Sequence, residues 1–294
     1  MKAIAKHFSF WLAGLLFFSL TFGLATGQEI SKSFQNVKSV KIKTVSGDCI
    51  VEKGSGSEVK VTVSYTYSDD EFEARLELRG SRLYLEEHFK SRSWRGGSRG
   101  SSKWSVTVPE NVLIDFSTAS GDLEASGMKN EFEASTASGN VTLKNMSGDI
   151  KASTASGDIA ISDSDGEFKL STASGEIELS NVSGYAKSST ASGRIYAEGL
   201  KGELGLSTAS GSIRARTLSG EMKLSTASGD VEASGVTLEG RSSFSAASGD
   251  VEVALAKTPE HDLKISSASG DAVLDLSGNA IKGFIEMAAR TDHG

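Results

Sequence analysis

The residues best suited to contact a charged partner lie in one short segment, residues 90–103, which reads KSRSWRGGSRGSSK. This segment carries five positive charges and no negative one, and its Gly and Ser content predicts a solvated, flexible loop. Arginine and tryptophan side chains bind anionic groups and aromatic rings, so this basic loop is the best candidate for a local contact site, and a solvated loop that contacts no partner is the alternative. The candidate contact residues are Arg92, Trp94, Arg95, Arg99, Lys103 and Trp104.

A second pattern places hydroxyl groups at a fixed interval. The tripeptide Thr-Ala-Ser recurs from residues 118–120 to residues 226–228. If these side chains point outward, they form a lattice similar to the hydroxyl faces of ice-binding β-solenoids. If they point inward, they bond along their own ladders or to the backbone of a corner. Each tripeptide precedes a glycine, where Ser and Thr commonly satisfy turn amides, so the sequence favours a structural role, with an ice- or ligand-binding lattice as the alternative.

Charged residues form two further rows that bear on catalysis. One row is acidic and holds Glu131, Asp149, Glu167, Glu203 and Glu221. The adjacent row, two positions further along each repeat, holds Lys151, Lys169, Lys187 and Lys223. A polysaccharide-cleaving β-helix needs a local cluster of acids and bases that interrupts the repeat, whereas these rows continue through it. We therefore predict a solvated, ion-paired face and no catalytic residue, and a carbohydrate-active β-helix enzyme is the alternative function.

Residues that bind metals do not gather in the sequence. The chain has one cysteine, Cys49, and four widely separated histidines. Calcium-binding β-rolls use a G-G-x-G-x-D pattern, but this chain has S-G-D, and its acidic position becomes arginine at Arg194. The sequence thus predicts no metal site and no cofactor. A net charge of −7 and a single RGG also argue against a nucleic-acid partner.

A repeat must position all of these side chains. The string STASG begins at seven serines that are separated by a constant interval: Ser117, Ser135, Ser153, Ser171, Ser189, Ser207 and Ser225. Degenerate copies begin at Ser245 and Ser266, and an earlier relative, TVSGD, begins at Thr44. Because so short an interval leaves no room for a helical hairpin, the period indicates a solenoid. A second glycine recurs midway between the STASG glycines, so each repeat consists of two half-turns.

Apolar and polar residues alternate inside each half-turn, as in a β-strand with one buried face. The first predicted inner row reads Leu123, Val141, Ile159, Ile177, Ile195, Ile213 and Val231. The second reads Phe132, Ile150, Phe168, Ala186, Leu204 and Met222. Glycines are expected to supply the positive φ of the corners. Stacked coils of this kind predict an all-β, single-stranded β-solenoid with 18-residue coils, and the preferred hand of parallel crossovers favours a right-handed β-helix.

The two ends of the mature chain depart from the repeat. Residues 28–110 are irregular, but the segments 40–42, 59–65, 83–85 and 104–108 read as strands. We expect them to cap the solenoid, because an open sheet end templates aggregation. The regular coils span residues 111–277. Residues 278–294 are predicted to form a C-terminal cap or the start of a truncated further coil.

Residues 1–27 have the composition of a signal peptide. Two lysines precede an apolar run over residues 8–24, and residues 25–27 are small. We predict cleavage after Gly27, and the loss of the two lysines changes the net charge from −7 to −9. The apolar run is at the short edge of what spans a bilayer, so an uncleaved N-terminal anchor is the alternative and the only expected membrane contact. The protein is expected in the periplasm, at the cell surface or in the extracellular medium.

The spaced S-G-D strands, the strand that ends at Val108-Pro109 and the export signal together resemble a bacterial β-solenoid family known as putative adhesins, related to the head-GIN type of putative autotransporter adhesin. The resemblance covers roughly residues 38–290. It implies an envelope or surface protein, and it carries over no catalytic residue. The sequence thus predicts a non-enzymatic surface β-solenoid that acts as an adhesin or a scaffold for a macromolecular or cell-surface partner.

Overall fold

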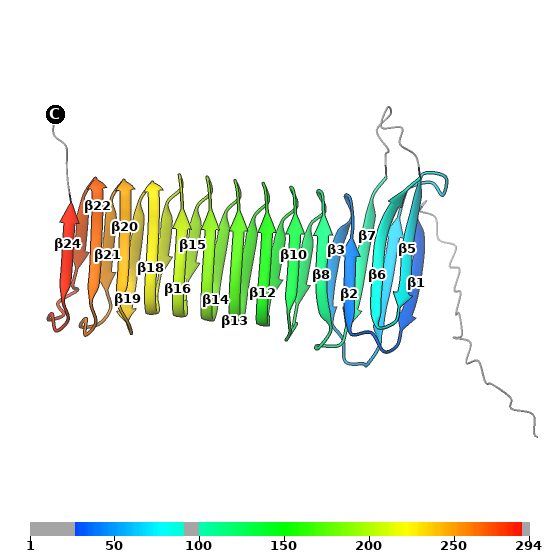
Figure 1. The fold of residues 1–294 in the computed structure, drawn as a ribbon, viewed down its shortest axis with the longest axis horizontal. Helices are drawn as coiled ribbons and strands as arrows, with labels where there is room; N and C mark the ends of the chain where they lie inside the picture. Colours follow the sequence, from blue (N-terminus) through cyan, green and yellow to red (C-terminus); the bar gives the residue numbers. More distant parts are fainter. Residues whose placement is uncertain (1–26, 91–99, 290–294) are drawn as a thin grey trace, which may run out of the picture.

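A computed structural model describes residues 27–90 and 100–289, and all of their strands belong to one continuous β-sheet wound into a rod (Figure 1). The rod consists of about ten stacked coils, which confirms the predicted β-solenoid. No helix that is long and apolar enough to cross a membrane occurs in these two ranges. The predicted signal peptide falls outside the described residues, except for Gly27.

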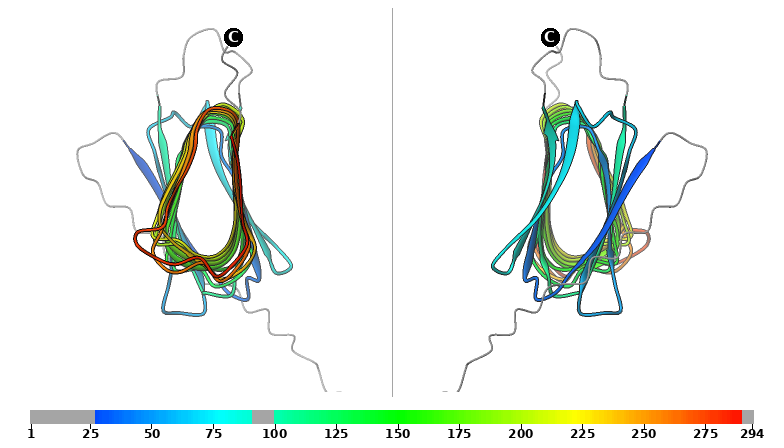
Figure 2. Two further views of the ribbon diagram at one scale, coloured as in Figure 1. Left: turned by 90° about the vertical axis from the view of Figure 1, so that its left-hand side faces the viewer. Right: turned by 90° about the vertical axis from the view of Figure 1, so that its right-hand side faces the viewer.

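Each coil has two long sides, which are seen end-on in Figure 2 and are called face A and face B here. Face A contains β5 (Phe72–Arg79), β6 (Arg82–Phe89), β2 (Ser39–Lys43), β8 (Leu113–Thr118), β10 (Phe132–Thr136), β12 (Ser147–Thr154), β16 (Lys201–Thr208), β18 (Ser219–Ser228), β20 (Ser242–Ser248), β22 (Leu263–Ser269) and β24 (Ile285–Ala289). Face B contains β1 (Gln28–Phe34), β4 (Val59–Tyr65), β7 (Ser102–Val108), β3 (Asp48–Lys53), β9 (Leu123–Ser126), β11 (Val141–Lys144), β15 (Ile195–Glu198), β17 (Ile213–Arg216), β19 (Val231–Leu238), β21 (Val251–Leu255) and β23 (Ala272–Asp275). Two longer strands, β13 (Ile159–Thr172) and β14 (Ile177–Thr190), bend from face B to face A.

Neighbouring coils stack in parallel and in register. In the central coils, each residue pairs with its counterpart one repeat later, as in Ile159 opposite Ile177 and Ile177 opposite Ile195. The longer spacings of the later repeats are absorbed at the corners, because Leu224, Phe244 and Ile265 still occupy one row. Every coil therefore presents the same side-chain position to the coil before it and to the coil after it.

The core is the column of apolar side chains enclosed by the coils. Every residue of the two predicted inner rows is buried, with at most 2% of its surface exposed. Large and small side chains complement one another along the column, since Ala186 lies between Phe168 and Leu204. The predicted assignment of inward and outward residues is thus confirmed.

The glycines of the two corners are needed for different reasons. At Gly175, in an STASG corner, an added Cβ would lie 1.8 Å from the carbonyl oxygen of Gly157 in the preceding coil. Gly175 is outside the left-handed region, so the expectation of positive φ is wrong there, and the close approach of the next coil excludes a side chain instead. At the second corner, Gly148 has φ of 101°, as expected.

Antiparallel strands cover the N-terminal end of the rod. β6 and β7 stack in parallel on β2 and β3, and β5 then adds to β6 in antiparallel orientation. On the other face, β4 and β1 follow β7, also antiparallel. The four segments predicted as strands lie within β2, β4, β6 and β7, whereas β1, β3 and β5 were not predicted.

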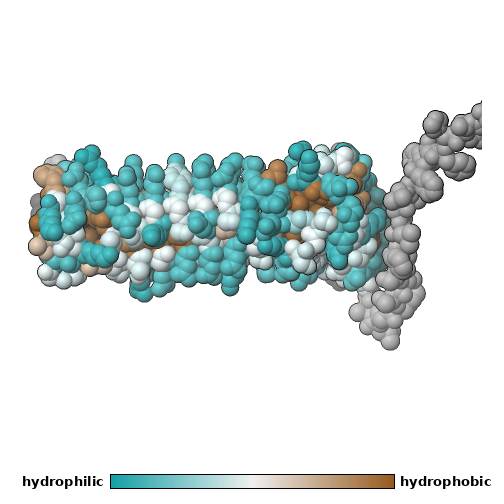
Figure 3. Space-filling view, turned by 90° about the horizontal axis from the view of Figure 1, so that it is seen from below, coloured by the Kyte–Doolittle hydropathy of each residue, from teal (hydrophilic) through white to brown (hydrophobic). Residues whose placement is uncertain are grey.

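At the opposite end, β24 pairs in parallel with β22, with Ile285 opposite Leu263, so these residues begin a further coil on face A. Large exposed apolar side chains occur in this last turn: Val273, Ile281, Phe284 and Met287. Figure 3 shows hydrophilic residues over most of the lower edge of the rod, with brown surface mainly toward its two ends.

Candidate functional site

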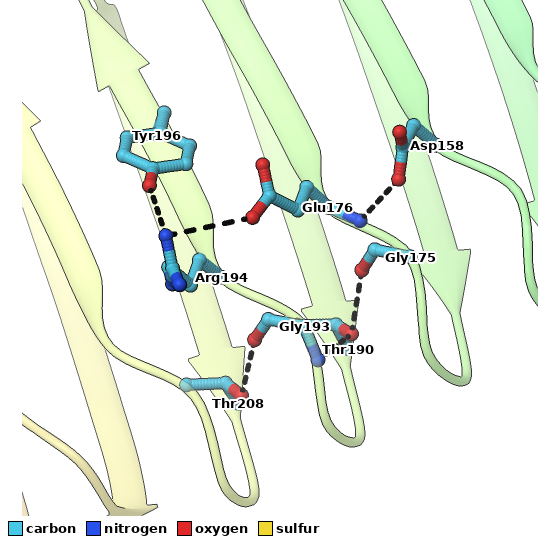
Figure 4. Close-up of polar contacts among 8 residues, drawn as sticks. All are labelled: Asp158, Gly175, Glu176, Thr190, Gly193, Arg194, Tyr196 and Thr208. Atoms are coloured by element: carbon cyan, nitrogen blue, oxygen red, sulfur yellow. Dashed lines mark hydrogen bonds and ion pairs between the residues drawn. The ribbon is translucent and has the colours of Figure 1, made fainter.

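The threonine of each Thr-Ala-Ser tripeptide points into the corner of its coil. Thr190 Oγ1 donates to the carbonyl oxygen of Gly175 in the preceding coil at 3.2 Å and accepts from the N–H of Gly193 at 3.0 Å (Figure 4). The same two bonds occur at Thr154, Thr172 and Thr208. These threonines are buried, so the outward threonine lattice of an ice-binding protein does not form.

The aspartate of the S-G-D motif also has a structural role. Asp158 Oδ1 accepts the backbone N–H of Glu176, in the next coil, at 2.7 Å (Figure 4). Asp122 bonds to the amide of Asn140 in the same way. Each such side chain accepts a hydrogen bond from a backbone N–H at the corner of the next coil. Across residues 27–90 and 100–289, no group of three or more His, Cys, Asp or Glu side chains could hold a metal ion.

The acidic and basic rows of face A form ion pairs in the first regular coils. Lys151 lies 3.8 Å from Glu131, and Lys169 pairs with Glu167. All four side chains are about half exposed. Ion pairs of this kind contribute at most about 1 kcal/mol each, so the rows form a solvated face, as predicted.

The outward-facing residues of the repeat change near the middle of the rod. On face B, Arg194 occupies the position that is acidic in the two preceding coils, and its Nη1 lies 3.0 Å from the Tyr196 hydroxyl and 3.8 Å from Glu176 Oε1 (Figure 4). The bond with Tyr196, together with the charge of Glu176, raises the pKa of the Arg194 guanidinium. In the next coil, Arg214 lies 3.4 Å from Glu232. Arg194 therefore places a cation beside the acidic side chain of the preceding coil, next to the Tyr196 ring.

Face A carries a groove of about 770 Å³ over the same coils and those that follow. Tyr185 lines one end, and Phe284 lines the other. Between them, Gly205 occupies the position that is lysine in the adjacent coils, at Lys187 and Lys223. The missing side chain lowers the floor of the groove. Sequence reasoning missed this groove, although the interruption of the lysine row at Gly205 was a visible signal.

The structure describes two of the six predicted contact residues. Arg92, Trp94, Arg95 and Arg99 lie outside the described residues. Lys103 is exposed on β7. Trp104 is completely buried on the same strand, because the alternation of β7 turns it inward with Val106 and Val108. The structure therefore removes Trp104 from the candidate contact residues.

Trp104 belongs to a hydrogen-bonded cluster around one carboxylate. Its indole N–H donates to Glu87 Oε1 at 3.2 Å, and Ser102 Oγ donates to the same oxygen. The amides of Val45 and Ser46 donate to Glu87 Oε2, at 2.6 and 3.2 Å. Glu87 thereby fastens the N-terminal strands to the first coil.

Cys49 is buried close to this cluster. Burial, with smaller effects from the charges of Glu87 and Asp48, raises the pKa of its thiol far above the ordinary value. A thiol in such surroundings is not reactive, so Cys49 is a core residue.

One protein-family model matches most of this chain. The Toastrack DUF4097 family model matches residues 55–202 and again residues 167–286. No curated protein matches the chain.

Solved structures with a similar chain path come from several bacteria. A putative lipid binding protein from Parabacteroides distasonis ATCC 8503 is 15% identical, with 91% of this chain and 98% of that chain covered and a TM-score of 0.37. A putative adhesin from Bacteroides fragilis NCTC 9343 is 12% identical, with 90% and 97% covered and a TM-score of 0.32. A putative cell adhesion protein from Clostridium sporogenes ATCC 15579 is 11% identical, with 90% and 100% covered and a TM-score of 0.25.

Proposed function

This chain belongs to the Toastrack DUF4097 family, and from that premise we propose that it is an exported, non-enzymatic β-solenoid that serves as a binding scaffold at the bacterial cell surface, as an adhesin does. The observation that carries this proposal is the exterior of the rod. The outer rows of side chains lie in register and form two long, polar faces. The apolar core between these faces is buried along the regular coils. Such a surface suits the recognition of an extended partner.

The chemistry of the described carboxyl groups supports a role without catalysis. A general acid at neutral pH needs a raised pKa and a base or substrate within hydrogen-bond reach. Hydrogen bonds from Arg75 and Lys53 instead lower the pKa of Glu73 and of Glu110, respectively. Face A carries its acids in exposed ion pairs with neighbouring lysines.

The basic loop is the proposed contact site on the N-terminal part of the scaffold. Its contact residues are Arg92, Trp94, Arg95 and Arg99, with exposed Lys103 following them on β7. Guanidinium groups and an indole ring suit an anionic or aromatic group on the partner.

One set of measurements tests export, binding and the absence of catalysis. We expect the mature protein to begin at Gln28 outside the cytoplasm and to bind isolated envelope material saturably. Recovery of an intact Met1 on membrane-bound protein would support the anchored form instead. The release of reducing ends from envelope polysaccharides would contradict the non-enzymatic role, and a failure to bind envelope material would contradict the scaffold.

The basic loop can be tested separately by replacing Arg92, Arg95 and Arg99 with serine. We expect weaker envelope binding and an unchanged melting temperature, because the three arginines lie in a Gly- and Ser-rich segment between β6 and β7. Equal binding by this variant and the wild type would remove the loop from the contact site.

A further inference from the structure

The groove on face A arises from a change in side-chain size along one outer row. From β14 to β22, this row reads Lys187, Gly205, Lys223, Ser243 and Lys264. Two lysines thus face each other across Gly205, two coil rises or about 9.6 Å apart. An added Cβ at Gly205 would have Lys187 Cγ as its nearest neighbour, at 3.9 Å. The fold does not require glycine here, in contrast to Gly175, so the hollow is not a consequence of backbone packing.

The groove also concentrates charged groups that have no ion-pair partner. Within the described parts of the chain, no ion pair engages Lys187, Lys223, Glu203 or Glu221, all of which line it. Earlier lysines of the same row are paired, as at Lys151. The groove therefore offers hydrogen-bond donors and acceptors to a ligand, whereas the corresponding groups elsewhere on face A are engaged in ion pairs.

The charges of the groove balance. The two free lysines offset the two free glutamates. The remaining charged groups of the lining pair with each other, Arg241 with Asp262 at 2.9 Å and Lys264 with Glu286 at 2.8 Å. A strongly anionic or cationic ligand therefore gains little net attraction. A neutral ligand rich in hydroxyl groups suits this lining, because each hydroxyl can donate to a carboxylate and accept from an ammonium group.

The other residues of the lining favour a sugar. Tyr185 presents an aromatic ring at one end, and Ser207 and Ser225 add hydroxyl groups along one side. A pyranose ring has an apolar C–H face that packs on aromatic rings and a polar edge of hydroxyl groups. The separation of about 9.6 Å across Gly205 is comparable to the length of two sugars in an extended chain.

We propose that this groove binds a neutral, linear polysaccharide whose chain runs along the axis of the rod. One sugar packs on Tyr185, and the hydroxyl groups of the following sugars bond to the free lysines and glutamates on either side of Gly205. This inference rests on the proposed scaffold function, since it names the class of partner that one face of the scaffold recognises.

The first test is a titration of the mature protein with hexamers of β-1,4-linked glucose, xylose and mannose, at low and high salt. We expect at least one of these hexamers to bind with an affinity that salt leaves unchanged, because the ligand carries no charge. Hexagalacturonate and hexaglutamate serve as anionic comparators. Tighter, salt-sensitive binding of either anion, or the absence of binding by all three neutral hexamers, would overturn the proposal.

Two pairs of variants then locate the site. Gly205→Lys fills the groove with the residue that the same row carries in neighbouring coils, and we expect it to weaken hexamer binding by about tenfold or more. Thr142→Lys adds the same charge on face B and should leave binding unchanged. Tyr185→Ala should weaken binding, whereas Tyr185→Phe, which keeps the ring, should restore most of it. Equal affinities for Gly205→Lys and Thr142→Lys would contradict the site.

Envelope binding separates this inference from the scaffold function. If the wild type and Gly205→Lys bind envelope material equally well and no neutral hexamer binds, the groove proposal fails and the scaffold remains. If the wild type binds no envelope material, the scaffold proposal itself fails. Competition by the hexamer that binds, for the wild type and not for Gly205→Lys, is the result that supports both.

Discussion

The regular coils and the N-terminal cap (β1 and β4–β7) stabilise their strands in different ways. In the coils, one small set of contacts recurs, and the bonds of Thr190 with Gly175 and Gly193 have counterparts in the coils before and after it. In the cap, the contacts are single and specific. Glu87 accepts four hydrogen bonds from two separate segments, and an aromatic cluster packs Tyr67 against Phe72 and Phe89.

This difference determines how each region responds to mutation. A recurring contact contributes modestly at each coil, so the loss of one copy leaves its neighbours in place. A single contact in the cap has no second copy. The difference also shows where function can arise, since outer positions of the coils are free to change while inner positions and corners are fixed, as Gly205 and Gly175 illustrate.

The largest effect of a single methyl group is expected at an STASG corner. Gly175→Ala places a Cβ 1.8 Å from the carbonyl oxygen of Gly157, so the coils must separate, and we expect a loss of at least about 3 kcal/mol in the free energy of unfolding. Gly205→Ala has no such clash and should change stability by less than about 1 kcal/mol, in the stabilising direction. Chemical denaturation of both variants checks this pair, and equal losses would contradict the account of the corners.

In the cap, Glu87→Ala leaves the Trp104 indole N–H and the amides of Val45 and Ser46 without an acceptor. We expect a loss of about 2–4 kcal/mol, confined to the cap. Cys49 provides the readout, because its buried thiol becomes reactive only when the cap opens, so its alkylation rate should rise steeply.

Glu86→Ala is the matched control for that variant. Glu86 follows Leu85 on the same strand and is half-buried on its outer side. The alkylation rate of Cys49 should be unchanged in this control. A similar increase in both variants would show that the cap does not depend on the Glu87 cluster.

The loss of a single corner threonine should lower the free energy of unfolding by a smaller amount. Thr190→Val keeps the shape of the side chain but removes its bonds to Gly175 and Gly193, and we expect a loss of about 1–2 kcal/mol. Ser192→Ala, at the exposed serine of the same tripeptide, should have almost no effect. Thermal melts that rank these two substitutions the other way would contradict the inward assignment of threonine.

One core substitution is expected to stabilise the rod. Ser188 is fully buried between Leu170 and Leu206, and its hydroxyl has no hydrogen-bond partner in the described structure. Ser188→Ala removes the unsatisfied group and should raise the free energy of unfolding by about 1 kcal/mol. A decrease in the melting temperature would mean that this hydroxyl has a partner in solution.

The period of the sequence was sufficient to predict the solenoid, its inner rows and the ion-paired face, because every coil repeats the same alternation. Features outside the regular repeat could not be predicted in this way. β1 is exposed along most of its length and has no buried position, so no alternation marks it as a strand. Trp104 was assigned to the basic loop by proximity, although the alternation with Val106 and Val108 would have placed it in the core. The groove depends on residues from successive coils, and only a comparison from one repeat to the next brings Gly205 between two lysines.

The central claim is that inner rows hold the rod together while outer rows are free to serve recognition. Two adjacent positions test it in one experiment. Ile177 is fully buried between Ile159 and Ile195, whereas Glu178 is exposed beside it. Ile177→Asp buries a carboxylate with no cation in its row, and Glu178→Lys changes a charge in water.

The decisive measurement is the free energy of unfolding of these two variants, accompanied by limited proteolysis. We predict a loss of several kcal/mol for Ile177→Asp, with early cleavage near residues 160–195, and a change of less than about 0.5 kcal/mol for Glu178→Lys. Equal tolerance of both substitutions, with the same cleavage pattern as the wild type, would contradict the separation of inner and outer rows.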